Sequence, residues 1–216
     1  MLKDRAGPAW KRASELAREG GVSAVWFTAL GKLCYRRAEI REHLLDEGSE
    51  NGHCGAQIAI DQLRPIDIEE YNAFRKPSDL NSAQHRMTAG HHCFIARHSG
   101  KIVCASWAAT SNARSAYLSA PVAVASDEVY VYDLFTAPEW RRQGIATAVT
   151  AALHNFYRAA GKRRVIRLIV PENTAARAQA IPYESIGRMG FVGVGRLRLK
   201  FCRMNAGKLP PGKSPA

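Results

Sequence analysis

Small side chains and positive charge occur together between positions 141 and 146. Arg141 and Arg142 stand beside Gly144 and Ala146. Residues 129–136, before them, are rich in β-branched and aromatic residues and predict a strand, and the Ala-rich stretch after them predicts an amphipathic helix. Small residues let a backbone approach a ligand, and the free N–H groups and the dipole of a helix start favour negative charge. The pattern therefore predicts an anion site, most naturally for a pyrophosphate.

Positive charge is concentrated in the same part of the chain. The 216 residues include 31 Lys and Arg against 19 Asp and Glu, a formal net charge of +12. Residues 139–204 hold 13 of the basic side chains and 3 of the acidic ones. A positive field there would help to capture a polyanionic ligand, and a solvated basic face is the alternative. Nucleic-acid binding is not expected, because the basic residues are not interleaved with stacking aromatics.

Length and composition indicate one folded domain with an appendage. A chain of 216 residues with 46% hydrophobic residues can bury a full core. No apolar run is long enough to span a bilayer and no signal peptide is evident, so we expect a cytoplasmic protein. The five cysteines contain no C-x-x-C pair, which predicts reduced thiols. His53-Cys54 and His91-His92-Cys93 lack a second cluster at matching spacing, so we expect no metal.

The first fifty residues predict a helical extension. One helix is predicted at residues 10–19, ending at Gly20-Gly21. A second helix is predicted from Ser23, with an apolar stripe and with Arg36, Arg37 and Arg41 toward its end. We expect the stripe to pack on the main domain or on a second subunit, which would make the protein a homodimer. A membrane-surface helix is the alternative, but the polar face is charge-balanced, so membrane association is not expected.

The main domain is expected at residues 56–204, after a Gly-containing linker at 48–55. Two helices are predicted before residue 90, the first with Asp67 as its N-cap and the second near Leu80. A hairpin turn is predicted at His98-Ser99-Gly100. The tail at 205–216 is expected to be disordered. Further strands are predicted at residues 58–63, 93–97, 101–108, 164–170 and 191–201.

Arg141-x-x-Gly144-x-Ala146, between a strand and a helix, resembles the Arg/Gln-x-x-Gly-x-Gly/Ala signature of the GNAT superfamily of N-acetyltransferases. Gly190-Phe191 further on adds to the resemblance, which covers residues 57–204. The resemblance implies an α/β fold with a mixed, mostly antiparallel sheet flanked by helices, and acetyl-CoA as co-substrate. The CoA contacts that it implies are Leu134, Phe135, Thr136, Arg141, Arg142, Gln143, Gly144, Ile145, Ala146, Thr147 and Asn173.

Acetyl transfer to an amine requires a base, because an alkylammonium is mostly charged at pH 7. Strand alternation places Glu128, Tyr130, Tyr132 and Leu134 on one face and Asp133 on the other. The resemblance implies that Glu128 is the base, with the tyrosines ordering water, and a strand-end carboxylate in solvent is the alternative. Asp133 is the second candidate base, or else a buried structural acid paired with an arginine.

The proton donor to the leaving thiolate is where the chain departs from the family pattern. Many members have a tyrosine four residues before the Gly-Phe pair, where this chain has Ile186. If a helix restarts at Pro182, Tyr183 shares a face with Ile186 and could reach the sulfur. A packing tyrosine is the alternative. A backbone N–H near Phe135 or Thr136 would polarise the thioester oxygen.

The resemblance implies an N-acetyltransferase of the acyltransferase class that works by direct attack in a ternary complex. The acceptor is expected to be a small-molecule amine or an amino sugar, with a protein amine as second choice. Helices of the family line the acceptor site, so Tyr71, His85 and Arg86 are candidate substrate contacts or ordinary surface and packing residues. The alternative function is a non-catalytic module that binds acyl-CoA as a sensor or interaction protein.

Overall fold

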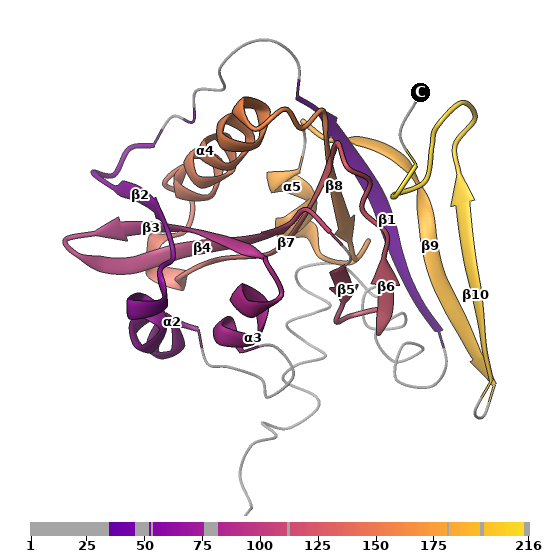
Figure 1. The fold of residues 1–216 in the computed structure, drawn as a ribbon, viewed down its shortest axis with the longest axis horizontal. Coiled ribbons are helices and arrows are strands. Elements are labelled where there is room, and N and C mark those ends of the chain that lie inside the picture. Colours follow the sequence, from indigo (N-terminus) through magenta and orange to yellow (C-terminus); the bar gives the residue numbers. More distant parts are fainter. Residues whose placement is uncertain are drawn as a thin grey trace, which may run out of the picture. The chain divides into compact units, whose positions relative to one another are not determined.

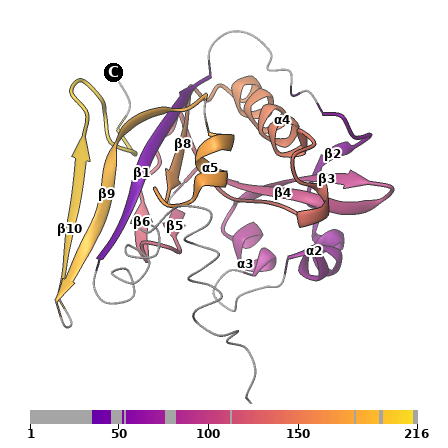
Figure 2. The same cartoon turned by 180° about the vertical axis from the view of Figure 1, so that it is seen from behind.

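The computed structural model describes residues 35–45, 52, 54–75, 82–111, 113–180, 182–194 and 197–213 (Figures 1 and 2). The helix predicted at residues 10–19 and most of the one predicted from Ser23 lie outside these residues. Contacts divide the chain into two compact units. The described residues of unit 1 come from the ranges 1–41, 115–120 and 168–210, and those of unit 2 from 42–114, 121–167 and 211–216.

The sheet of unit 2 has the strand order β8-β7-β4-β3-β2. Its strands are β2 (Ala59–Gln62), β3 (His92–His98), β4 (Lys101–Ala109), β7 (Glu128–Thr136) and the part of β8 (Arg164–Ile169) that ends at Arg167. Neighbouring strands are antiparallel except β7 and β8, which are parallel. The predicted mixed, mostly antiparallel sheet is therefore confirmed. The predicted β3–β4 turn is also confirmed, with φ of 47° at Ser99 and 80° at Gly100.

Helix α4 (Ile145–Ala159) covers one face of this sheet (Figure 1). The ring of Phe94 in β3 contacts the rings of Phe156 and Tyr157 in the helix, at centroid distances of 5.4 and 6.0 Å. Gly161 follows the helix with a φ of 76°, a left-handed conformation that commonly ends helices. The amphipathic helix predicted after the strand is thus confirmed.

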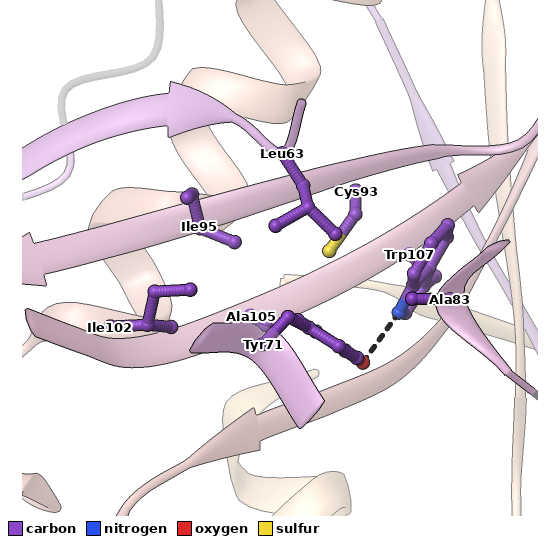
Figure 3. Packing of buried hydrophobic residues seen from close by; sticks show 8 residues of the cluster. All are labelled: Leu63, Tyr71, Ala83, Cys93, Ile95, Ile102, Ala105 and Trp107. Carbon is purple, nitrogen blue, oxygen red and sulfur yellow. Dashed lines mark hydrogen bonds between the residues drawn. The ribbon is translucent and has the colours of Figure 1, made fainter. Parts of the chain in front are cut away.

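Short helices cover the other face and enclose a hydrophobic cluster (Figures 2 and 3). These are η1 (Pro65–Asp67), α2 (Ile68–Phe74) and α3 (Ala83–Thr88). Asp67 precedes α2 as expected, but its carboxylate makes no cap bond and binds Arg64 and Arg97 instead. Within the cluster, Nε1 of Trp107 donates a hydrogen bond of 2.7 Å to the hydroxyl of Tyr71. Its buried members are Leu63, Tyr71, Ala83, Cys93, Ile95, Ile102, Ala105 and Trp107.

Residues 35–44, expected at the end of a helix, form strand β1 (Tyr35–Leu44), so the helical interpretation is wrong there. Ala38, Ile40 and Glu42 are buried and alternate with more exposed residues, which is the period of a strand. Glu42 occupies an inward position because Arg164 binds its carboxylate at 2.7 Å. Because a charged residue occupies an inward position, the hydrophobicity pattern alone does not show the alternation of a strand.

The last predicted strand, at 191–201, is a hairpin of β9 (Glu184–Val194) and β10 (Leu197–Met204) in unit 1. Val194 pairs with Leu197, so the chain reverses within the predicted strand. The strand order here is β10-β9-β1. A Cβ at Gly190 would lie 2.1 Å from the carbonyl oxygen of Arg36, so only glycine permits this close approach of β9 to β1.

The connection between β4 and β7 contains the short strands β5 (Ala113–Ser115) and β6 (Ala120–Val122). Residues 205–213, expected to be disordered, make defined contacts. In unit 1 the backbone N–H of Asn205 donates to the carbonyl of Ile186 at 2.8 Å. In unit 2 the N–H of Gly212 donates to Glu128 at 2.7 Å. The polar composition of residues 205–213 suggested disorder, because the groups that accept their hydrogen bonds lie far away in the sequence.

Candidate active site

The turn before α4 has the backbone geometry of an anion site. Arg142 and Gly144 have φ of 66° and 80°, and Gly144 is the N-cap of the helix. The first helical hydrogen bond runs from the N–H of Ala148 to the carbonyl of Gly144, at 3.0 Å. The N–H groups of the preceding first turn, from Ile145 to Thr147, therefore have no partner within the helix. Ile145 is 1% exposed and anchors this turn in the core, whereas Arg141, Arg142, Gln143 and Thr147 are exposed.

The turn is fixed by contacts from both sides. Nε of Arg141 donates to the carbonyl of Thr136 at 3.2 Å, which ties the turn to the end of β7. The carbonyl of Gln143 accepts from the N–H of Gly55 and from the thiol of Cys54, at 3.2 and 3.3 Å. Gly52, Cys54 and Gly55 thus lie along the start of α4, and the expected anion site has a firm backbone frame.

A bulge interrupts the pairing of β7 with β4. Ala105 pairs with Phe135, but Trp107 pairs with Tyr132, so two residues of β7 lie opposite one residue of β4. Asp133, in the bulge, has a φ of 51°. The bulge moves Asp133 to the α2–α3 face, the face of Tyr132, so the predicted simple alternation is wrong at this point. It also leaves backbone groups near Leu134 outside the ladder.

The side chains after the bulge point to opposite faces. On one face, Phe135 contacts the ring of Phe74 at 5.4 Å, the guanidinium carbon of Arg75 at 4.4 Å and that of Arg141 at 5.9 Å. On the other, the hydroxyl of Thr136 donates to the sulfur of Cys104 at 3.2 Å. The ring of Phe135 therefore joins the α2–α3 face to the turn before α4.

Asp133 binds two arginines. Nη2 of Arg75 and Nη1 of Arg86 donate to its two carboxylate oxygens, each at 2.7 Å. Burial raises the pKa of Asp133, but the hydrogen bonds and charges of the two arginines outweigh burial and bring the pKa below its usual value. The guanidinium of Arg86 also stacks over the rings of Trp107 and Tyr132, at 5.0 and 5.2 Å. The second interpretation of Asp133, a structural acid paired with arginine, matches this geometry.

A tyrosine–histidine pair lies beside these charges. The hydroxyl of Tyr132 is 2.6 Å from Nδ1 of His91, and its ring stacks on that of Tyr130 at 5.3 Å. Burial raises the pKa of Tyr132, so its hydroxyl keeps its proton at neutral pH. A neutral imidazole can accept that proton, so this pair can transfer protons.

Glu128, the expected base, lies at the start of β7, at the opposite end of the strand from Thr136. It is 0% exposed. Nη1 of Arg164 donates to one carboxylate oxygen at 2.8 Å, and the N–H groups of Ala125 and Gly212 donate to the other at 3.0 and 2.7 Å. The alternative of a strand-end carboxylate in solvent is therefore wrong, and this environment suits a structural carboxylate rather than a group that exchanges protons with substrate.

Two expected site residues belong to unit 1. Asn173 caps helix α5 (Thr174–Gln179), because its side-chain oxygen accepts from the N–H of Ala176 at 3.0 Å. Tyr183 is 2% exposed. It leads into strand β9, which begins at Glu184, so the helix expected to restart at Pro182 is wrong.

Sequence reasoning named part of this site and missed part of it. Of the three candidate substrate contacts, Arg86 binds Asp133. Tyr71 is buried and His85 is exposed. Arg75 and His91 were missed. A strand-interior Asp133 signals a cationic partner, but which arginine supplies it depends on folding.

Two properties of the described residues bear on other kinds of site. Among them, no group of three or more His, Cys, Asp or Glu could hold a metal ion. None of the helices in this described part has the length and apolar content that a membrane crossing requires.

Unit 1 contains a hollow of about 590 Å³. None of the residues that line it is an expected site residue; they are Tyr35, Ser185, Gly187, Arg188, Phe201, Arg203, Met204 and Asn205.

Comparison with known families and structures gives a consistent result. The family model "Acetyltransferase (GNAT) family" matches residues 60–180. No curated protein matches the sequence. A GCN5-related N-acetyltransferase from Sphaerobacter thermophilus is 17% identical, with a TM-score of 0.51 over 76% of this chain and 54% of that chain. A glucosamine N-acetyltransferase region of a fungal multi-domain β-N-acetylglucosaminidase is 14% identical, with a TM-score of 0.54 over 77% and 22%. An aminoglycoside N-acetyltransferase in complex with CoA is 22% identical, with a TM-score of 0.46 over 56% and 87%.

Proposed function

The chain belongs to the acetyltransferase (GNAT) family and is a GNAT-type N-acetyltransferase, and we propose that it transfers an acetyl group from acetyl-CoA to a primary amine by direct attack in a ternary complex. The observation that carries this proposal is the turn before α4, where Gly144 adopts φ of 80° at the N-cap and the first-turn N–H groups lack helical partners. These donors and the helix dipole favour a pyrophosphate.

The proposed donor site extends from the turn onto the end of β7. The N–H groups from Gln143 to Thr147 bind the pyrophosphate, and the exposed Arg141 and Arg142 add positive charge. The backbone of Leu134 to Thr136, after the bulge, pairs with the pantetheine arm and polarises the thioester oxygen. Asn173 is a further proposed CoA contact through its amide nitrogen, since its side-chain oxygen caps α5.

Tyr132 and His91 are the proposed proton acceptors. As the amine nitrogen attacks the thioester carbon, its proton passes to the hydroxyl oxygen of Tyr132, and the hydroxyl proton passes to Nδ1 of His91, 2.6 Å away. The new C–N bond replaces the C–S bond, and the thiolate leaves and takes up a proton. Tyr183 stays the proposed donor of that proton. Glu128 is not proposed as the base, because both its carboxylate oxygens are engaged in hydrogen bonds.

The proposed acceptor is a small molecule or an amino sugar, with a protein amine as second choice. Tyr132, Asp133 and Arg86 converge on the α2–α3 face within one hydrogen-bonded and stacked group. Because these polar groups lie close together, they suit a compact small-molecule acceptor better than an extended polypeptide.

Calorimetric titration with acetyl-CoA, CoA and a longer acyl-CoA tests the donor site. We expect saturable binding to the wild type and its loss in Gly144→Trp. Gly161→Trp is the matched control, because Gly161 has a similar φ of 76° at the other end of α4 and open space around it. Equal loss in both variants, or no binding to the wild type, would contradict the proposed site.

The catalytic proposal has its own matched pair of variants. Tyr132→Phe removes the hydroxyl that faces His91, and we expect kcat to fall by about 100-fold with the Kd for acetyl-CoA unchanged. Tyr157→Phe removes a similar hydroxyl, 3.1 Å from His92, on the α4 face and should keep kcat. Binding of acetyl-CoA without turnover of any amine would instead indicate a sensor.

A further inference from the structure

The α2–α3 face has more positive charge than its own carboxylate neutralises. Asp133 carries one negative charge and binds both Arg75 and Arg86. Of the two acidic residues of α2, Glu69 is exposed and Glu70 is already engaged, because it binds Arg97 and the N–H of Ile102. The Asp133 cluster thus keeps one uncompensated positive charge.

Both arginines also keep unused donors. Within the described residues, Nε of Arg75 and Nε of Arg86 are buried and have no hydrogen-bond partner. The Arg86 side chain is 10% exposed and that of Arg75 38%. A buried donor without a hydrogen-bond partner is energetically unfavourable, so such donors are uncommon in folded proteins.

Stacking explains the position of Arg86 but not its free donors. Its guanidinium lies over the rings of Trp107 and Tyr132. A stacked guanidinium uses its flat face for the rings and keeps its N–H groups, which lie in the plane, for a hydrogen-bond acceptor. The aromatic rings therefore help to hold the guanidinium of Arg86 in place, while its Nε has no acceptor among the described residues.

This charge lies next to the proposed transfer point. Besides binding Asp133, the guanidinium of Arg75 contacts the ring of Phe135, and Arg141 of the turn before α4 contacts the same ring. Tyr132, the proposed proton acceptor, lies under Arg86. An acceptor whose amine reaches Tyr132 would have its remaining atoms beside the two arginines.

We propose that the acceptor is a primary amine that also carries an anionic group, a carboxylate or a phosphate, which Arg75 and Arg86 bind. The proposal rests on the proposed acetyltransferase function and deepens it. A carboxylate or phosphate oxygen would accept from the free edges of the two guanidinium groups, which match both anions in geometry. A polyamine would meet net positive charge and bind weakly.

Matched pairs of amines test the proposal with the full chain. Butylamine is compared with 4-aminobutyrate, ethanolamine with phosphoethanolamine, and glucosamine with glucosamine 6-phosphate, with spermidine as the polycation. We expect kcat/KM to be at least about 10-fold higher for the anionic member of at least one pair, mainly through KM. The carboxylate and phosphate pairs identify which anion is bound.

Two variants connect the preference to the arginines. Arg86→Gln and the more exposed Arg75→Gln should reduce the anionic preference to less than about 3-fold while acetyl-CoA binding persists. Arg97→Gln, a control that removes an arginine bound to Asp67 and Glu70, should keep the full preference. If Arg86→Gln fails to fold, Arg75→Gln alone decides.

Other outcomes overturn the inference and separate it from the proposed function. Turnover of neutral amines or spermidine as efficient as that of the anionic partners overturns the anionic acceptor and leaves the acetyltransferase function intact. A preference that persists in both arginine variants overturns the assigned residues. Acetyl-CoA binding without turnover of any amine overturns the proposed function and the inference together.

Discussion

At the scale of single residues, the two acidic side chains of β7 each hold arginine side chains on different parts of the strand. Glu128 is fully buried and holds Arg164 and two backbone N–H groups. Asp133 reaches the α2–α3 face through a bulge and holds Arg75 and Arg86. Their consequences for stability and activity can be separated by substitution.

Glu128→Gln should destabilise the protein by about 3 kcal/mol, because a buried guanidinium then loses its charged partner and an amide NH₂ meets backbone donors. Urea unfolding at pH 7 measures this change. Glu139→Gln, at an exposed position, is the control and should leave the unfolding midpoint unchanged. A fully stable Glu128→Gln variant that loses activity would instead restore Glu128 as the base.

Asp133→Asn should destabilise the protein by about 2 kcal/mol at pH 7, because two charged hydrogen bonds are weakened. The folded-state pKa of Asp133 is lowered, so its charged form stabilises the fold above the unfolded pKa of about 3.9, and this stabilisation is lost as pH falls through the folded pKa. The difference from wild type should therefore be constant from about pH 5 to 8 and shrink below about pH 4. Urea unfolding at several pH values measures it, with Asp61→Asn at an exposed position as control. Wild-type stability of Asp133→Asn at pH 7 would contradict the ion pairs.

At the scale of elements, the sequence predicts what local chemistry determines. Strand β7, the turn at Gly144 and helix α4 were predictable because their propensities and periods lie within about thirty consecutive residues. The bulge at Asp133 was not, because it arises from the pairing of β7 with β4. The turn and helix of the candidate donor site were therefore predictable, as was Arg86 as a candidate substrate contact, whereas Arg75 and His91 on the acceptor side were not.

Strand β1 shows the same limit in another form. Its inward Glu42 is acceptable only because Arg164, more than a hundred residues later, binds it. Without that partner a buried glutamate would be strongly unfavourable, so hydrophobic patterning favours a helix here. Similarly, β9 and β10 read as one strand because alternation continues through the reversal between Val194 and Leu197.

The contact of Gly52 with α4 can be tested by one methyl group. A Cβ at Gly52 would lie 2.4 Å from the Cα of Ala148, so Gly52→Ala must displace the segment from the helix. We expect a loss of about 1–3 kcal/mol and weaker acetyl-CoA binding, because the segment holds Gln143. Thermal unfolding and calorimetry measure both effects.

Gly55→Ala is the matched control for this substitution, because a Cβ at Gly55 would meet nothing within 4 Å. It should keep both the unfolding temperature and the affinity of the wild type. Equal behaviour of the two variants would show that Gly52, Cys54 and Gly55 do not support the turn before α4.

At the scale of the whole molecule, the order of motifs along the chain was enough to predict the family and the fold, and the family model confirms it over residues 60–180. Sequence order could not predict how the chain divides into units. Leu134, Phe135, Thr136 and the turn before α4 belong to unit 2, whereas Asn173 and Tyr183 belong to unit 1. The motif-based prediction treats these residues as one site because it follows the order of the family's motifs. The division into compact units depends instead on contacts between residues that are distant in sequence.

The end of the described chain returns to the centre of unit 2. The N–H of Gly212 donates to Glu128, and the carbonyl of Lys213 accepts from Arg164 at 3.1 Å. Both partners are buried, so removing residues 211–216 leaves a carboxylate oxygen and a guanidinium N–H each short of one hydrogen bond. We expect the truncated protein to lose about 2 kcal/mol of stability in urea unfolding. A chain that ends at Lys213 keeps both bonds and should match the wild type. Wild-type midpoints in both truncations would show that residues 211–213 contribute nothing to the stability of unit 2, and an equally large loss in both would place the stabilising contact after Lys213.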